Sequence, residues 1–361
     1  MADKKTIIHV IYNLARGGAE TMLINVLPEL SEYRNIVVTL SGENHFGDAL
    51  KCDQLICLKG SSLFTIPASV HKLKKLIRQL RPALIHSHLP LSNFVARLAT
   101  PKAIPLITTI HTPVSAAVDY KKWYVRTLER CTYSFRPSTI IAVSQQVLKD
   151  YFDFLQTNRK RALIIYTFPP TSLVMTEKAG PTSERTKILT VGSLREIKNF
   201  AYLIEAFGFL KNENIELHIY GRGSEMANLQ AMIDRLQVNV VLKGQVNNIP
   251  EVMGQYDLFT MASKFEGFSV SVLEAMNAKL PMLLSDIPSF REQCENCALY
   301  FSLNDPADFA NKLKNLIADQ HKMKSLTILA YTRLMHNFTL AHHVQQIKDL
   351  YAKELVGEKI P

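Results

Sequence analysis

The chain has 361 residues, a length typical of two domains, and its 47% of hydrophobic residues excludes a disordered or collagen-like protein. The 42 basic and 32 acidic residues give a net charge of +10, and residues 1–170 alone carry 22 basic against 11 acidic residues. This asymmetry favours an anionic partner, either nucleic acid or membrane, and the alternative is a merely basic domain. No apolar run approaches the roughly 20 residues that span a bilayer.

The first half predicts a doubly wound α/β domain. Short apolar runs alternate with segments of helical period, and runs such as 83–86 and 105–110 are apolar on both faces, as in central strands of a parallel sheet. The expected strands are 6–12, 34–40, 54–58, 83–86, 105–110, 139–143 and 162–165. The expected helices are 18–30, 67–80, 89–99, 117–135 and 144–155.

The alternation of strands and helices stops at residues 168–186, where proline, glycine, serine and threonine indicate a linker. A second alternation follows, with strands expected at 187–191, 215–220, 239–242, 257–260 and 281–284. Its helices are expected at 199–211, 224–236, 270–278, 306–318 and 321–336, before a last one at 340–355. We therefore predict two Rossmann-like domains, 1–170 and 171–340, and a C-terminal helix in 341–361 that returns towards the first domain. Open α/β sheets bind ligands at the carboxyl ends of their strands, so the two domains should face each other across a cleft that holds the site.

Two glycine-containing loops follow expected strands. Gly17 and Gly18 stand between the first strand and the first helix, where free backbone N–H groups suit a phosphate, although a tight turn is the simpler explanation. In the loop that begins at Gly192, Arg195 and Lys198 add two cations, which a desolvated diphosphate requires. The alternative is a pair of solvated surface charges. Gly221-Arg222-Gly223, after a later strand, does not complete a dinucleotide fingerprint.

The most specific pattern is a pair of acids eight residues apart, Glu266 and Glu274. Glu266 lies in a loop beside Gly267, and Glu274 lies on the helix that begins near Phe268. A carboxylate can accept two hydrogen bonds from a vicinal diol of a ribose or a sugar, while a helix N-terminus can hold a phosphate. The alternative is a helix with an N-terminal acid and one surface acid.

His111 ends a strongly apolar strand and could hydrogen-bond a substrate hydroxyl, although a lone histidine is more often structural. No cluster of Cys and His with metal-ligand spacing is visible, so we predict neither a metal nor a cofactor. The five cysteines, with no export signal, indicate reduced thiols and a cytoplasmic protein.

Taken together, these segments resemble glycosyltransferase family 4, the retaining nucleotide-sugar transferases of GT-B fold, over nearly the whole chain. The segments that carry the resemblance are Gly17-Gly18-Ala19-Glu20, His86-Ser87-His88, His111, Ala142-Val143-Ser144, the loop from Gly192 to Asn199, Gly221-Arg222-Gly223, Glu266-x7-Glu274 and Pro281 with Ser285-Asp286-Ile287-Pro288. The pair of acids with its Glu-Gly-Phe start is the most specific of them.

The resemblance implies a role for each site residue. Gly17 and Gly18 would approach the donor diphosphate, and Lys198 with Arg195 would neutralise it. Glu274 would hold the ribose hydroxyls. The catalytic candidates His111 and Glu266 would contact the donor sugar. Gly267 and the backbone amides of Phe268, Ser269 and Val270 would lie near the same sugar.

Two positions depart from the family's pattern. The family usually has arginine directly after the glycine of the second loop, where this chain has Ser193, and Arg195 would replace it only if the loop follows a different path. The Asn-Gly-hydrophobic-Asp stretch that often precedes the linker is replaced by residues 165–170. The Ser193 departure leaves a catalytically silent nucleotide-sugar-binding partner as an alternative to a transferase. A nucleotide-sugar epimerase of the same fold is a further alternative.

The basic excess has two candidate locations, 69–81 and 120–136. In the first, Lys72, Lys75 and Arg78 lie off an apolar stripe, and the second interleaves aromatic residues with cations. Aromatic residues beside cations favour an anionic membrane interface, although apolar stripes more often face a core. We therefore expect a UDP- or GDP-sugar donor and a glycan or lipid-linked acceptor of envelope polysaccharide synthesis. We also expect peripheral attachment to the inner face of the cell membrane, and no nucleic acid partner.

Overall fold

The computed structural model describes residues 4–15, 17–60, 62–115, 117–157, 161–169, 185–246 and 248–357. The chain forms two compact units: Met1–Phe168 together with Leu340–Pro361, and Pro169–Thr339. Most of the linker expected at 168–186 lies outside the described residues. The C-terminal helix, treated above as a separate segment, is part of the first unit.

The first unit is built on a seven-stranded parallel sheet with the strand order β3-β2-β1-β4-β5-β6-β7. Its central strands are buried along their length because both faces are covered by helices, as the continuous apolar runs predicted. The chain order reverses between β1 and β4, which is the point where doubly wound sheets bind ligands. The strands are β1 (Thr6–Ile11), β2 (Arg34–Thr39), β3 (Gln54–Cys57), β4 (Leu84–His88), β5 (Leu106–Ile110), β6 (Thr139–Ala142) and β7 (Ala162–Ile164).

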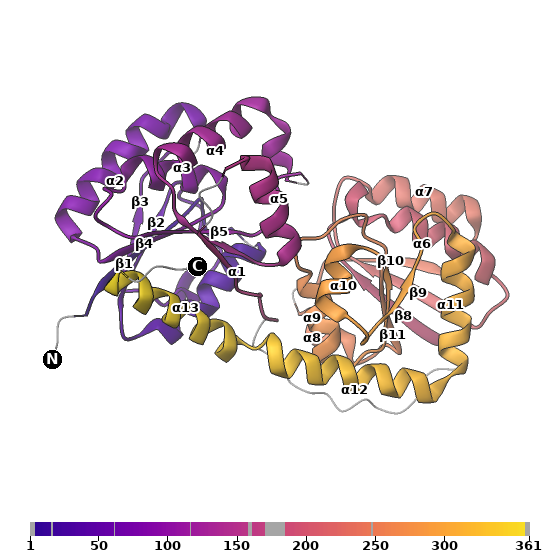
Figure 1. The fold of residues 1–361 in the computed structure, drawn as a ribbon. Coiled ribbons are helices and arrows are strands. Elements are labelled where there is room, and N and C mark those ends of the chain that lie inside the picture. The colour runs from indigo at the N-terminus through magenta and orange to yellow at the C-terminus, as the bar shows by residue number, and fades with distance from the viewer. Residues whose placement is uncertain are drawn as a thin grey trace. The chain divides into compact units, whose positions relative to one another are not determined.

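The helices of this unit lie on both faces of the sheet, with α2, α3 and α4 side by side (Figure 1). They are α1 (Gly18–Val26), α2 (Ile66–Leu80), α3 (Pro90–Ala99), α4 (Trp123–Phe135), α5 (Gln145–Leu155) and α13 (Leu340–Val356), with short 3-10 turns η1 (Leu27–Leu30), η2 (Gly47–Ala49), η3 (Leu63–Thr65) and η4 (Val118–Lys121). The helices predicted over 18–30 and 117–135 are each divided into a 3-10 turn and an α-helix in the structure. Pro28 coincides with the change from α1 to η1, because proline cannot donate the helical hydrogen bond. The extended backbone of Lys122 separates η4 from α4.

Helix α13 packs against the sheet of the first unit alongside α1 (Figure 1). Ile347 and Leu350 join a core that includes Ile7 and Leu84. The Tyr351 hydroxyl lies 2.7 Å from Nδ1 of His86 on β4. Buried apolar area and a buried polar contact therefore both hold the C-terminal helix on the first unit.

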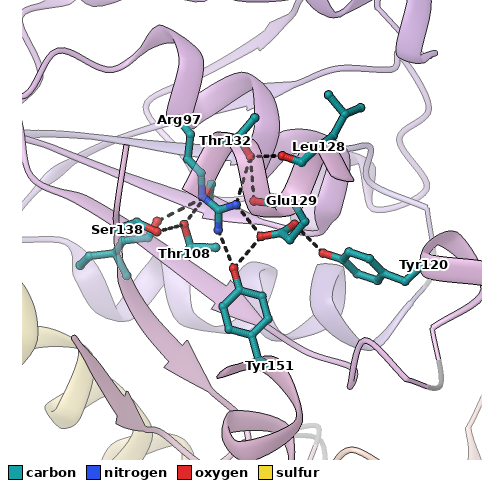
Figure 2. A network of polar contacts seen from close by, with 10 residues as sticks. Arg97, Thr108, Tyr120, Leu128, Glu129, Thr132, Ser138 and Tyr151 are labelled. Atoms are coloured by element: carbon teal, nitrogen blue, oxygen red, sulfur yellow. Dashed lines mark hydrogen bonds and ion pairs between the residues drawn. The ribbon is translucent and has the colours of Figure 1, made fainter. Parts of the chain in front are cut away.

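A buried ion pair joins three helices of the same unit (Figure 2). Arg97 on α3 pairs with Glu129 on α4, and both side chains are fully buried. The Tyr120 hydroxyl donates to Glu129 Oε2 at 2.6 Å, and the Tyr151 hydroxyl on α5 lies 2.8 Å from an Arg97 nitrogen. Each charge therefore has an opposite charge and further hydrogen bonds, which is the condition for tolerating ions in a core.

The second unit contains a six-stranded parallel sheet with the order β10-β9-β8-β11-β12-β13, which reverses between β8 and β11. Helices α6, α7 and α11 lie on one side of it, and α9 packs against α12 on the other (Figure 1). The strands are β8 (Thr186–Val191), β9 (Ile215–Tyr220), β10 (Val240–Gly244), β11 (Leu258–Met261), β12 (Met282–Ser285) and β13 (Leu299–Phe301). The helices are α6 (Phe200–Phe207), α7 (Met226–Leu236), α8 (Ile249–Met253), α9 (Val270–Asn277), α10 (Pro288–Cys294), α11 (Pro306–Ala318) and α12 (Gln320–Asn337), with 3-10 turns η5 (Glu196–Lys198) and η6 (Gly208–Leu210).

Candidate functional site

The reversal point of the second sheet brings together two residues that the sequence singled out separately. Lys198 follows β8 and Glu266 follows β11, and the Lys198 Nζ lies 2.5 Å from Glu266 Oε1. Ser263 donates a second hydrogen bond to the same carboxylate oxygen at 2.6 Å. The backbone N–H of Lys264 donates to the Ile197 carbonyl at 2.9 Å, so the two loops are also joined through their main chains. A cation and an acid therefore stand together where open α/β sheets bind ligands.

The loop after β8 is held in place by the glycines of the next loop. The Leu194 N–H donates to the Arg222 carbonyl at 2.9 Å. A Cβ at Gly221 would lie 1.9 Å from the Gly192 carbonyl oxygen, and Gly221 has a φ of +150°. A Cβ at Gly223 would lie 2.2 Å from the Leu194 carbonyl oxygen. Gly221 and Gly223 therefore allow two backbones to pack closely, which is a positioning role.

The Arg195 side chain contacts Ser193, the residue at which the sequence departs from the family's pattern. This side chain is exposed, and its Nε donates a hydrogen bond of 3.0 Å to Ser193 Oγ. The loop therefore brings the Arg195 guanidinium next to Ser193 at the end of β8. Two cations, Arg195 and Lys198, accompany this loop, which suits an anionic ligand.

Glu274 is buried on α9, and no charged group in the described part of the chain compensates its carboxylate. The side chain is 9% exposed, and burial raises the pKa of its carboxyl group to about 7. Among the described residues, no side chain donates a hydrogen bond to this carboxylate. A buried acid without a partner is costly to the free protein, so Glu274 is available for donors that a ligand would bring.

The start of α9 only partly matches the expectation of free backbone amides. Ser269 precedes the helix, and its N–H already donates to Gln293 Oε1 at 3.1 Å. The Gln293 amide nitrogen returns a hydrogen bond of 2.8 Å to the Ser269 carbonyl. Phe268 is buried and its ring contacts Phe338 edge-on, whereas Gly267 and Val270 are partly exposed. The expected donor contact through the Ser269 amide would thus compete with Gln293, a residue that the sequence did not indicate.

In the first unit, Gly17 and Gly18 open the N-terminus of α1 after β1. A Cβ at Gly17 would lie 2.4 Å from Glu20 Oε2, so the absence of a side chain lets the Glu20 carboxylate fold back over this turn. A Cβ built at Gly18 would meet no heavy atom within 4 Å in the described residues beyond its chain neighbours and its own helix backbone. Burial, opposed by a hydrogen bond to its own backbone N–H, raises the pKa of Glu20. An incoming phosphate would have to displace this acid from the helix end.

His111 follows β5 and lies beside a second histidine. Its Nε2 is 3.4 Å from Nδ1 of His88, at the end of β4. Burial, with the nearby His343, lowers the pKa of His111 to about 4. The imidazole is therefore neutral at pH 7, with one nitrogen able to donate and the other to accept a hydrogen bond.

The aromatic residues of the basic segment 120–136 do not all lie on the surface, as a membrane-binding face would require. Tyr120 and Tyr133 are buried, whereas Trp123 and Phe135 are 75% and 67% exposed. Near Phe135 lies a pocket of about 350 Å³. Its lining contains four cations and no acid among the described residues: Lys74, Ile77, Arg78, Leu98, Ala99, Thr100, Pro101, Lys102, Phe135 and Arg136. None of the helices in the described ranges is both long and apolar enough to cross a membrane.

Two Rossmann-like units, each built on a parallel sheet whose strand order reverses once, place the chain in the GT-B fold class. Two family models match the chain: Glycosyltransferase Family 4 over residues 16–172 and Glycosyl transferases group 1 over residues 185–319. The chain therefore belongs to the family 4 glycosyltransferases. The predicted fold class and family are confirmed.

Curated relatives and solved structures agree with this family. The chain is 26% identical over 340 residues to the N-acetylgalactosamine-N,N'-diacetylbacillosaminyl-diphospho-undecaprenol 4-alpha-N-acetylgalactosaminyltransferase of Campylobacter jejuni, covering 90% of this chain and 93% of the relative. It is 24% identical over 339 residues to the O-antigen biosynthesis glycosyltransferase WbnH of Escherichia coli, covering 90% and 94%. Anabaena HepE in complex with UDP superposes with a TM-score of 0.81 at 18% identity, covering 96% of this chain and all of HepE.

Proposed function

We propose that this glycosyltransferase is a retaining enzyme that moves a hexosyl or N-acetylhexosaminyl group from a UDP-sugar to a lipid-linked glycan of the cell envelope. The Lys198–Glu266 pair at the reversal point of the second sheet is the observation that carries the donor half of this proposal. The UDP complex of HepE supports the choice of nucleotide. The diphospho-undecaprenol named in the Campylobacter relative supports a lipid-linked acceptor.

We assign the diphosphate to Lys198 and Arg195, and the ribose to Glu274. Lys198 would exchange part of its contact with Glu266 for a phosphate oxygen, and Glu266 would then be free to accept a sugar hydroxyl. Arg195 stands beside Ser193 and would supply the guanidinium that the family usually carries there. Gly17, Gly18, Gly267 and the backbone of Phe268 and Val270 remain predicted donor contacts, and His111 remains the predicted contact to the reacting sugar.

The proposed reaction breaks the bond between the anomeric carbon and the diphosphate oxygen. The acceptor oxygen attacks the face from which the diphosphate departs, and the acceptor proton passes to the departing diphosphate. The protein then contributes charge stabilisation and positioning, and neither a metal ion nor a protein nucleophile is part of the proposal. Lys198 and Arg195 would neutralise the negative charge that grows on the leaving group.

A panel of UDP-, GDP-, ADP- and TDP-sugars, read by calorimetry and by nucleotide release, tests the transferase. We expect UDP-sugars to bind, and with a polyprenyl-diphosphate-linked sugar as acceptor we expect a product with the anomeric configuration of the donor, read by NMR. An inverted anomer would refute the retaining mechanism. Binding without transfer to any acceptor would favour the silent partner, and interconversion of the nucleotide-sugar without an acceptor would favour an epimerase.

Replacing Glu274 by glutamine should change stability and UDP affinity in opposite directions. The pKa of Glu274 is raised from 4.5 to about 7 on folding, so the folded protein holds the proton between these values. The free energy of unfolding of the wild type therefore falls as the pH rises from about 4.5 to 7, by roughly 3 kcal/mol, and then stays level. Glu274→Gln has no carboxylate to ionise, so its free energy of unfolding should not fall in this pH range. In urea unfolding at pH 8 it should therefore be more stable than the wild type.

The same variant should bind UDP about 10- to 100-fold more weakly, because hydrogen bonds to an ionised group are worth about 1.5–3 kcal/mol. Wild-type affinity should rise with pH up to about 7, where Glu274 ionises, and the variant should lack this rise. Glu205→Gln, an exposed change on α6 on the other side of the sheet from α9, is the matched control. Unchanged UDP affinity in Glu274→Gln would remove the ribose assignment.

We further propose that the cationic pocket beside Phe135 docks on anionic lipid. The exposed ring of Phe135 and the cations Lys74, Arg78 and Lys102 combine an apolar contact with positive charge, which favours such an interface. Lys74→Glu/Arg78→Glu should reduce sedimentation with vesicles containing anionic lipid to the level seen with neutral vesicles. Lys211→Glu/Lys324→Glu, two exposed changes in the second unit, should sediment like the wild type. Equal sedimentation of the wild type with both vesicle types would contradict this proposal.

A further inference from the structure

Three buried histidines form a cluster on one face of the first sheet. His9 on β1 is paired in register with His86 on β4, and His88 lies two residues further along β4 on the same face. All three side chains are at most 3% exposed. The ring centres of His86 and His88 are 4.2 Å apart, and that of His9 lies 6.0 Å from His86 and 6.5 Å from His88. We call His9, His86 and His88 the histidine cluster.

The partner of His9 determines which of its nitrogens carries the proton. The Asn35 amide nitrogen donates to the Leu30 carbonyl at 2.9 Å, so the Asn35 oxygen faces His9 Nε2, 3.1 Å away. His9 Nε2 is therefore the protonated nitrogen, and Nδ1 carries a lone pair. This is the arrangement that orients metal-binding histidines, in which one nitrogen donates to a protein oxygen and the other binds the ion.

Two nitrogens of the cluster have no hydrogen-bond partner among the described residues. They are Nδ1 of His9 and Nε2 of His88, and both are fully buried. A buried polar atom left without a hydrogen bond costs about 1–3 kcal/mol, so two in one cluster indicate a missing occupant. His86 has hydroxyl partners on both sides, Tyr351 at Nδ1 and Thr109 at Nε2, each at 2.7 Å. A hydroxyl can rotate away, which would free one His86 nitrogen.

A cavity of about 20 Å³ lies at the cluster, with room for one small occupant. Within the described ranges its lining contains no lysine, arginine, aspartate or glutamate: His9, Met22, Leu23, Val26, His86, His88, Thr109, Ile141, Val143, Ile165, His343, Ile347 and Tyr351. One potential ligand nitrogen from each cluster histidine lies within 4.8 Å of the other two. Tetrahedral zinc at 2.0–2.1 Å from each nitrogen needs separations of roughly 3.4 Å, which small ring rotations would supply.

The charge state of the cluster also suits a cation. Burial lowers the pKa of His9 to about 4, and burial with the neighbouring histidines holds the pKa values of His86 and His88 well below the usual range. Neutral imidazoles have the lone pairs that a metal ion requires. The ion would then carry the positive charge in this part of the core.

We propose that His9, His86 and His88 bind one zinc-class divalent ion as a structural site of the first unit. The ion would take His9 Nδ1, His88 Nε2 and His86 Nε2 in place of the Thr109 hydroxyl, with a water as fourth ligand. His86 Nδ1 would keep its contact with Tyr351, so the ion would strengthen the attachment of α13 to the sheet. This inference is independent of the proposed donor chemistry, in which no metal takes part.

The test measures metal content in the full chain, purified without a histidine tag after expression with zinc. We expect about one zinc per chain by elemental analysis, and chain expressed with cobalt in place of zinc should show the visible absorption of tetrahedral cobalt. His9→Gln retains an amide for Asn35 but removes the free nitrogen, and His88→Asn retains a group facing His111. Both should lose the metal, whereas His71→Gln, an exposed change on α2, should retain it.

Thermal unfolding provides a second measurement. Refolding the wild type with a chelator should lower its Tm relative to refolding with zinc, and His9→Gln should show no difference between the two. Circular dichroism at 20 °C identifies a variant that fails to fold, and the cobalt spectrum of the wild type does not depend on any variant. Wild-type chain without metal under both preparations would overturn the proposal. Metal retained by His9→Gln and His88→Asn would overturn it as well, because the ion would then lie elsewhere.

Discussion

Lys198→Met is expected to lower the rate of sugar transfer by about 10²- to 10³-fold. Removing one preorganised charge from a developing anion typically costs that much, and Lys198 is the more buried of the two cations on the loop after β8. The loss should appear in kcat as well as in UDP affinity, because the charge on the diphosphate grows as the sugar departs. Steady-state kinetics with the best donor of the panel, together with calorimetry of UDP, measures both quantities.

Lys264→Met is the matched control for this change. Lys264 lies on the neighbouring loop and its exposed side chain pairs with the exposed Glu196 at 3.2 Å, an interaction worth little in water. Its transfer rate should stay within about twofold of the wild type. If Lys198→Met transferred sugar at the wild-type rate, the Lys198–Glu266 pair would be a structural ion pair and the donor site would have to be placed elsewhere.

Arg97→Met is expected to lower the free energy of unfolding by about 3–5 kcal/mol. The change leaves Glu129 as a buried carboxylate with hydroxyl partners but no cation, and breaking a buried pair on one side carries that cost. Urea unfolding followed by circular dichroism measures it. Sugar transfer at low temperature should persist, because we assign neither Arg97 nor Glu129 to the donor.

A double change separates the cost of an unpaired charge from the contribution of the pair. Arg97→Met/Glu129→Leu removes both charges, so it should recover most of the stability lost in Arg97→Met. The exposed pair Arg291–Asp286 is the surface comparison, and Arg291→Met should cost less than about 1 kcal/mol. A double variant no more stable than Arg97→Met would mean that packing of the Arg97 side chain, not charge, holds α3, α4 and α5 together.

The strands of both sheets were predictable because their signal is local. The apolar run at 6–12 corresponds to β1 and the run at 105–110 to β5, each within one residue. The short elements β13, α8 and α10 were missed, since three to seven residues carry too little periodicity to be distinguished from a loop. The single helix predicted over 117–135 was wrong, because helical period continues across Lys122 although the backbone there is extended.

The candidate site was predictable as a set of loops but not as an arrangement. Glu266, Glu274, Lys198 and Arg195 were each identified from their place after a strand or on a helix. Nothing in the sequence indicated that Gln293 accepts a hydrogen bond from the Ser269 N–H, because a glutamine on a helix is compatible with many environments. The Arg97–Glu129 pair was also missed, although an arginine within the apolar segment 89–99 was a detectable indication.

The sequence by itself determined the fold class, the family and the loops that carry charge, because these depend on periodicity and on short motifs along the chain. Only the tertiary structure decided which of these residues meet. Lys198 and Glu266 are 68 positions apart and become neighbours because β8 pairs with β11. Burial raises the pKa of Glu274, and the pairing of β1 with β4 gathers the histidine cluster. Burial and contact depend on how strands and helices pack, and no local pattern records that packing.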